Sequence, residues 1–246
     1  VTGQIMGMML SIFFNFKKNN EIEFHFKNMR LDLQTVRSIY SVGLPSIVMA
    51  SIASVMTFGL NKILMAFTST ATAVFGVYFK LQSFIFMPIF GMNNGVVPII
   101  AFNYGAKKKE RILKTMKFAA ISFLCMMSVG VIIFESIPHV LLSFFDASEE
   151  MIKIGVPALR RIALHFPIAA LCIMMISSFQ ALGNGVISMI ISFVRQLVIL
   201  LPSAYLFAKT GVLENVWWAF ILAEIGAFII SSIFMIRVYK KQLKNL

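Results

Sequence analysis

Charged residues are scarce in this sequence. Asp, Glu, Lys and Arg together make up 13% of its 246 residues, about half the share that is usual in soluble domains. Hydrophobic residues make up 59%, and apolar stretches of about 20 residues, long enough to cross a bilayer as a helix, recur along the chain. A soluble globular domain is therefore excluded. The composition predicts an all-α fold, a polytopic transmembrane helix bundle in contact with membrane lipid.

Cysteine and acidic residues are also few. Cys125 and Cys172 lie in separate apolar segments, so we expect neither a disulfide framework nor a metal site, and no cofactor. Ten acidic residues stand against 22 Lys and Arg, which gives a formal net charge of +12. This excess does not predict nucleic-acid binding, because the basic residues lie between apolar segments and not on one face of a soluble domain.

The first 40 residues differ from the rest. Residues 1–16 would form a helix about 24 Å long, too short to span. Because Lys17-Lys18 and no small-residue cleavage site follow, we interpret this segment as the end of a transmembrane helix truncated at its start, and not as a signal peptide. Residues 17–40 are predicted to form an interfacial linker, with alternation at Glu21, Glu23, His25 and Lys27.

Residues 41–246 are predicted to form a six-helix transmembrane lobe with a C-terminal tail. Residues that favour turns separate its apolar segments, which cover residues 41–67, 71–97, 118–142, 162–182, 186–208 and 212–236.

The basic residues alternate between connections. Sixteen of the 22 fall within residues 17–37, residues 107–117, at Arg195, or within residues 237–244, and four fall on the intervening connections. Since Lys and Arg in short loops favour the cytoplasmic side, we expect a multi-pass protein of the cell (inner) membrane with a cytoplasmic linker (17–37) and C-terminus. Trp217 and Trp218 would then lie in the outer aromatic belt.

Ionisable residues inside spans are candidates for function because they are expensive to bury. Lys80, Arg195 and Glu224 lie well within predicted helices, and a Lys80–Glu224 ion pair would relieve the burial of both charges. His165, four residues after Arg161 and so on the same helical face, is a proton relay or a packing residue. Lys62 and Glu135 lie closer to helix ends, where long side chains can snorkel.

Two polar edges follow the helix of residues 71–97. At 100° per residue, Lys80, Phe84, Met87, Gly91 and Asn94 share one stripe, and Gln82 and Asn93 share another. These side chains either line a cavity or bond to neighbouring helices. The candidates for a substrate or ion pathway are Lys80, Gln82, Asn93, Asn94, Gln180, Arg195 and Glu224.

Specific motifs accompany these patterns. They are Gly43-Leu44-Pro45, Asn61, Phe75-Gly76, Lys80, Ser83-Phe84, Pro88, Gly91, Pro98, Asn103-Tyr104-Gly105-Ala106, Phe179-Gln180-Ala181-Leu182-Gly183-Asn184-Gly185, Arg195-Gln196 and Pro202. From about Ser41 to the C-terminus the sequence resembles the second repeat of the multidrug and toxic-compound extrusion family. The resemblance implies one lobe of a twelve-helix antiporter that exports amphipathic, often cationic small molecules by alternating access, coupled to sodium or protons. It also implies a missing N-terminal six-helix lobe.

The sequence departs from part of that family. Some members carry an acidic cation ligand on the first helix of this lobe, whereas residues 41–67 contain no Asp or Glu, and residues 162–182 contain none either. The decisive carboxylate would then lie in the missing half.

Other functions remain open at this point. A lipid-linked oligosaccharide flippase of the same superfamily would need more cationic residues facing the cavity, of which Lys80 and Arg195 are the only mid-helix candidates. A non-transporting membrane subunit is the other alternative. An enzyme is not expected, since intramembrane catalysis would need a nucleophile with a base, or paired acids, within the helices.

Overall fold

The computed structural model describes residues 2–18 and 32–244. The predicted alternation at Glu21, Glu23, His25 and Lys27 lies outside the described residues. The chain divides into two compact units, Val1–Ser41 and Val42–Leu246. The first unit contains α1 (Thr2–Lys18) and the beginning of α2 (Leu33–Met65). Within the described residues the fold is all-α, as the sequence predicts.

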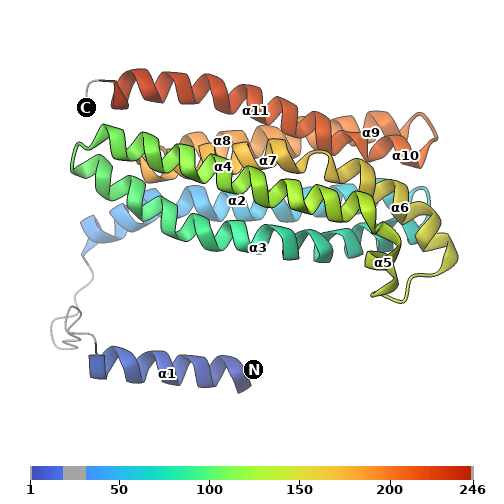
Figure 1. Cartoon of the computed structure of the whole chain (residues 1–246), viewed down its shortest axis with the longest axis horizontal. Coiled ribbons are helices and arrows are strands. Elements are labelled where there is room, and N and C mark those ends of the chain that lie inside the picture. The colour runs from blue at the N-terminus through green and yellow to red at the C-terminus, as the bar shows by residue number, and fades with distance from the viewer. Residues whose placement is uncertain (1, 19–31, 245–246) are drawn as a thin grey trace. The chain divides into compact units, whose positions relative to one another are not determined.

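The second unit continues α2 and contains the remaining helices (Figure 1). They are α3 (Ser69–Gly105), α4 (Lys109–Ser136), α5 (Pro138–Ser143), α6 (Glu149–Ala163), α7 (Phe166–Ala181), α8 (Gly185–Phe193), the π-helix η2 (Val194–Leu200), α9 (Leu201–Ala208), α10 (Leu213–Val216), α11 (Trp218–Val238) and the π-helix η3 (Tyr239–Leu243).

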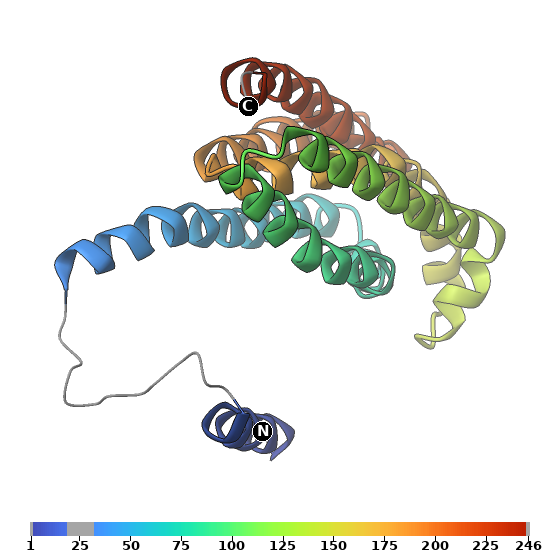
Figure 2. The ribbon, with the colours of Figure 1, turned by 60° about the vertical axis from the view of Figure 1, so that its left-hand side comes forward.

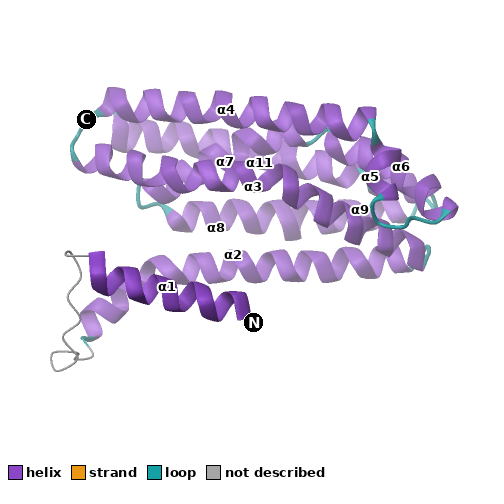
Figure 3. Ribbon diagram, turned by 60° about the horizontal axis from the view of Figure 1, so that its bottom comes forward, coloured by secondary structure: helices purple, strands orange, loops and turns teal. Residues whose placement is uncertain are grey.

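Five helical stretches of the described chain are long and apolar enough to cross a membrane: Gly43–Met65, Ser69–Gly105, Lys109–Ser136, Gly185–Ala208 and Leu213–Leu243. The pair α6 and α7 makes a sixth if it counts as one span, bent by 48°. The long helices of the second unit run roughly side by side (Figure 2), and short loops join them (Figure 3). These helices confirm the prediction of a polytopic transmembrane bundle.

Helices extend beyond the apolar segments that predicted them. α2 begins at Leu33, inside the stretch expected as linker, and Asp32 caps it by accepting from the backbone N–H groups of Gln34 and Thr35. α4 begins at Lys109, so most of its basic residues are helical. Hydropathy underestimates such helices because Lys, Arg and Gln are good helix formers that merely lie outside the hydrocarbon.

The predicted span 162–182 is broken. α6 ends at Ala163 and α7 begins at Phe166, because Pro167 has no N–H and its ring clashes with a carbonyl four residues back. Arg161 and His165 therefore do not share a helical face, and that expectation is wrong. Arg161 instead forms an ion pair with Glu214 of α10 at 2.5 Å.

The core of the second unit forms where α4 packs against α3 and α7, and where α7 packs against α11. Gly130 of α4 allows α3 and α7 to approach α4 closely, because a Cβ at this position would lie 2.5 Å from Ile85 Cγ2 and 3.3 Å from Phe166 Cδ2. Trp217 is fully buried in this core, whereas Trp218 is 42% exposed. The expectation that both tryptophans lie in an aromatic belt is therefore wrong for Trp217, whose ring packs inside the bundle.

Candidate functional site

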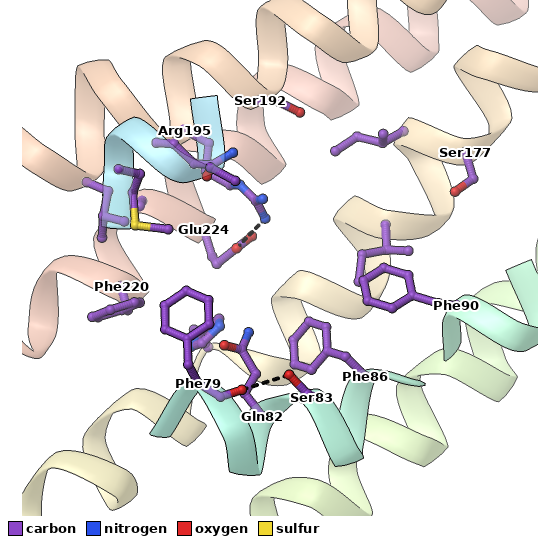
Figure 4. A pocket seen from close by; sticks show the side chains of 18 of the residues that line it. Phe79, Gln82, Ser83, Phe86, Phe90, Ser177, Ser192, Arg195, Phe220 and Glu224 are labelled. Carbon is purple, nitrogen blue, oxygen red and sulfur yellow. Dashed lines mark hydrogen bonds and ion pairs between the residues drawn. The ribbon is translucent and has the colours of Figure 1, made fainter. Parts of the chain in front are cut away.

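A cavity of about 470 Å³ lies within the second unit, between α2, α3, α7, α11 and the α8–η2 segment. Its volume is in the usual range for small-molecule sites. Aromatic side chains form much of its wall (Figure 4), namely Tyr78, Phe79, Phe86, Phe90 and Phe220. Amide and hydroxyl side chains complete the lining, including Gln82, Asn93, Ser177, Gln180, Ser192 and Gln196.

One buried ion pair lies at this cavity. Arg195 Nη1 of η2 donates to Glu224 Oε1 of α11 across 2.7 Å. Glu224 is only 6% exposed, while the Arg195 side chain is 25% exposed. Glu224 Oε2 and Arg195 Nε are buried with no hydrogen-bond partner among the described residues. The pair is thus held by a single hydrogen bond, and each partner keeps an unused polar atom in a site of low dielectric.

Arg195 lies at the beginning of a local irregularity of the helix. η2 is π-helical, and the N–H of Leu201 donates to the carbonyl of Gln196, five residues back. Pro202 follows in the first turn of α9, where it supplies no N–H and so favours a local change of winding. π-helical turns shift the side chains that follow them and occur often at functional sites.

His165 lies at the break between α6 and α7 and lines the same cavity. It is 4% exposed, and its Nδ1 lies 2.5 Å from the carbonyl oxygen of Ile162. Since a carbonyl only accepts, Nδ1 carries the hydrogen of this bond. The ring packs against Phe220, with 5.9 Å between centroids. The geometry is compatible with both expectations for His165, the relay and the packing residue.

The structure brings together six of the sequence candidates: Gln82, Asn93, His165, Gln180, Arg195 and Glu224 all line the cavity. Lys80 and Asn94 do not line it and are exposed on α3, as are the other members of their stripe. Lys80 Nζ instead lies 5.6 Å from the ring centroid of Phe145. The hypothesis of a Lys80–Glu224 ion pair is therefore wrong, because Glu224 pairs with Arg195.

The candidates that the sequence offers do not include the aromatic wall of the cavity. Phe79, Phe86 and Phe90 recur at helical spacing with Gln82 and Asn93 on α3, so the second polar stripe contained the signal. Tyr78 and Phe220 lie on different helices, α3 and α11, and stack edge to face with 5.8 Å between ring centroids. That contact depends on packing between helices and leaves no local pattern in the sequence.

Comparison with known proteins identifies the fold. The MatE family profile matches residues 45–206. The chain belongs to the MatE family. It is 23% identical over 224 residues to the multidrug export protein MepA of Staphylococcus haemolyticus. The aligned region covers 91% of this chain and 49% of MepA.

Solved structures of MATE transporters have the same fold as this MatE chain. An outward-facing multidrug resistance MATE family transporter of the MOP superfamily gives a TM-score of 0.88 at 20% identity, over 98% of this chain and 55% of that one. A second structure is that of a MOP superfamily transporter from Pyrococcus furiosus, for which reversed polarity of the binding pocket suggests a different function. It gives a TM-score of 0.84 at 22% identity and matches over 94% of this chain and 54% of that one. This MatE chain thus spans about half the length of the relatives it matches.

Proposed function

We propose that this MatE chain is one lobe of a cation-coupled antiporter that exports amphipathic, often cationic small molecules by alternating access. The observation that carries the proposal is the buried Arg195–Glu224 pair beside an aromatic wall, in a cavity large enough for a small molecule. Residues of the bent α6–α7 span and of the π-helical segment η2 also line the cavity. Irregular helices at ligand sites are typical of transporters built from repeats.

The lining fits an amphipathic cation better than an anion. Aromatic faces attract organic cations through their quadrupole, and amide and hydroxyl groups supply orienting hydrogen bonds. Arg195 is the only Lys or Arg among the lining residues of the described chain, and Glu224 neutralises it. A lipid-linked oligosaccharide flippase needs cations free to hold pyrophosphate, so the position of Lys80 outside this cavity disfavours that alternative.

The remaining parts of the proposal concern the complete protein. A second six-helix lobe supplies the opposite wall of the transport pathway, and the lobes rock about it. The coupling ion is sodium or a proton, with no cofactor. The end of the second unit that carries residues 107–117, and its C-terminal tail, face the cytoplasm.

The test is transport by the complete gene product, expressed in cells that lack their own multidrug pumps. Cells preloaded with ethidium should lose the dye faster than cells with empty vector, and an imposed inward gradient of sodium or of protons should accelerate the loss. If ethidium efflux equals that of the vector while reconstituted protein moves a lipid-linked oligosaccharide between leaflets, the flippase function replaces this one.

A further inference from the structure

One end of the second unit carries a dense cluster of basic residues that the cavity does not use. Six belong to the turn between α3 and α4 and the first turns of α4: Lys107, Lys108, Lys109, Arg111, Lys114 and Lys117. Four belong to the end of α11, to η3 and to the residue directly after η3: Arg237, Lys240, Lys241 and Lys244. We call these ten residues the basic end, and all except the half-buried Lys109 are exposed.

The two halves of the basic end are joined although they lie far apart in the sequence. Lys109 Nζ donates to the carbonyl oxygen of Lys244 across 2.7 Å and lies 5.7 Å from the ring centroid of Tyr239. The start of α4 and the C-terminal end of α11 accordingly meet at the same end of the unit (Figure 1). The fold thus combines two basic segments into one surface, with Glu110 as the one acid within them.

The opposite end has no such charge excess. It carries five basic residues, Lys62, Lys153, Arg160, Arg161 and Lys209, and five acids, Glu135, Asp146, Glu149, Glu150 and Glu214. Arg160 and Arg161 are paired there, with Glu135 at 3.7 Å and with Glu214 at 2.5 Å. The basic end, by contrast, has no internal ion pair among those the structure describes. Its charge can be compensated only by something outside this part of the chain.

Helix stability does not explain the half of the basic end on α4. The N-terminus of a helix is the positive end of its dipole, so basic residues in the first turns are unfavourable. α4 nevertheless begins with Lys109, Glu110 and Arg111, and its N-cap residue Lys108 makes no side-chain cap. An anionic partner beside these residues would offset both the dipole and their mutual repulsion.

Exposed apolar residues place the basic end at headgroup depth. On α4, Phe118 follows Lys114 by one turn on the same face and is 65% exposed; on α11, Ile236 precedes Lys240 by four residues and is 57% exposed. Side chains such as Phe118 and Ile236 meet acyl chains in a transmembrane bundle, so a lysine one turn beyond them meets phosphate headgroups. The aromatic ring of Tyr239, 37% exposed, suits the same interface.

From this arrangement we propose that the basic end is a binding surface for anionic phospholipid headgroups, which associate with Lys114 and Lys240 and their basic neighbours. Clusters of four to eight basic residues next to a transmembrane helix attract anionic lipids, each residue contributing about fivefold in affinity. The proposal does not depend on the transport function, because none of the ten residues of the basic end lines the cavity.

The experiment uses the full chain, purified and reconstituted in phosphatidylcholine vesicles with 20% phosphatidylglycerol. Nitroxide-labelled phosphatidylglycerol or phosphatidylcholine is added in trace amounts, and the motionally restricted fraction at the protein surface gives their relative affinities. We expect an average preference of about twofold for phosphatidylglycerol, since only some of the lipids around the helices contact the basic end. About 0.5 M salt should remove most of this preference in the unsubstituted protein.

In the variant Lys114→Gln/Lys240→Gln, the ratio of the affinities for phosphatidylglycerol and phosphatidylcholine should fall towards one. The matched control Lys153→Gln/Lys209→Gln, from the opposite end, should leave this ratio unchanged. An equal loss in both variants, or a preference that persists in high salt, would overturn the proposal. So would binding of a labelled oligonucleotide through the same two lysines in vesicles without any lipid preference, which would assign the surface to nucleic acid. Because vesicle reconstitution presents anionic lipid in both leaflets, altered orientation of the variant does not affect the result.

Discussion

Arg195 Nη1 and Glu224 Oε1 lie 2.7 Å apart and join the π-helical segment η2 to the middle of α11. A single hydrogen bond makes this contact, although Arg can offer two parallel ones. The pair therefore depends on the charge of Arg195 more than on the fork geometry of its guanidinium.

The first prediction compares two substitutions of Arg195. Arg195→Met should lower the free energy of unfolding in detergent by about 3 kcal/mol, the lower end of the range for breaking a buried pair, since the arginine is one-quarter exposed. Arg195→Lys should lower it by less than about 1 kcal/mol, because an ammonium can replace a one-point contact. Denaturant titration measures both. A larger loss for Lys than for Met would show that the charge is unimportant.

The second prediction concerns topology. The orientation proposed above, with the basic end in the cytoplasm, rests on the excess of Lys and Arg there. In a background with Cys125→Ala and Cys172→Ala, an impermeant maleimide applied to intact cells should then label Ser148→Cys but not Lys108→Cys. Ser148 caps α6 at the other end of the unit. Labelling of Lys108→Cys from outside would reverse the orientation proposed above.

The third prediction concerns the close approach at Gly130. Gly130→Ala should destabilise the protein by about 1–3 kcal/mol, because the new methyl meets a β-branched side chain, Ile85, that cannot rotate away. Gly91→Ala is the matched control, since nothing lies within 4 Å of the added atom, and it should be neutral or stabilising. Thermal unfolding of the two variants gives the comparison. Equal melting temperatures would contradict the packing of α4 against α3.

The fourth prediction concerns pH and the start of α2. Hydrogen bonds from the Thr35 hydroxyl and backbone, and from the Gln34 backbone, lower the pKa of Asp32. A depressed carboxyl pKa stabilises the folded state above the unfolded pKa, near 4, and this contribution is lost as the pH falls through the folded value. Protection of the Thr35 amide against hydrogen exchange, relative to the chemical rate, should thus fall on acidification, and Asp32→Ala should lack this dependence. Identical pH profiles would show that Asp32 does not cap the helix.

The sequence predicted the membrane bundle well and the site only in part. Long apolar stretches identify spans because every backbone group in a bilayer must be satisfied within a helix. Gln82 and Asn93 could be placed on one face by helical spacing alone. The partner of Glu224 could not, because Arg195 reaches it from another helix and the contact depends on how the two helices pack. The break between α6 and α7 at His165 could be predicted only in part. Pro167 indicates a kink in the sequence, but it does not give the angle of 48° between the two helices.

The central claim, that the cavity around Glu224 moves a cationic substrate, is tested most directly by ethidium efflux from cells expressing the complete protein with Glu224→Gln. The neutral amide keeps the size of the side chain but removes the charge that pairs with Arg195. We predict at least about a tenfold loss of efflux per folded molecule, the effect of about 1.4 kcal/mol, while the exposed control Glu150→Gln transports like the unsubstituted protein. Unchanged efflux and an unchanged pH profile in Glu224→Gln would contradict the claim.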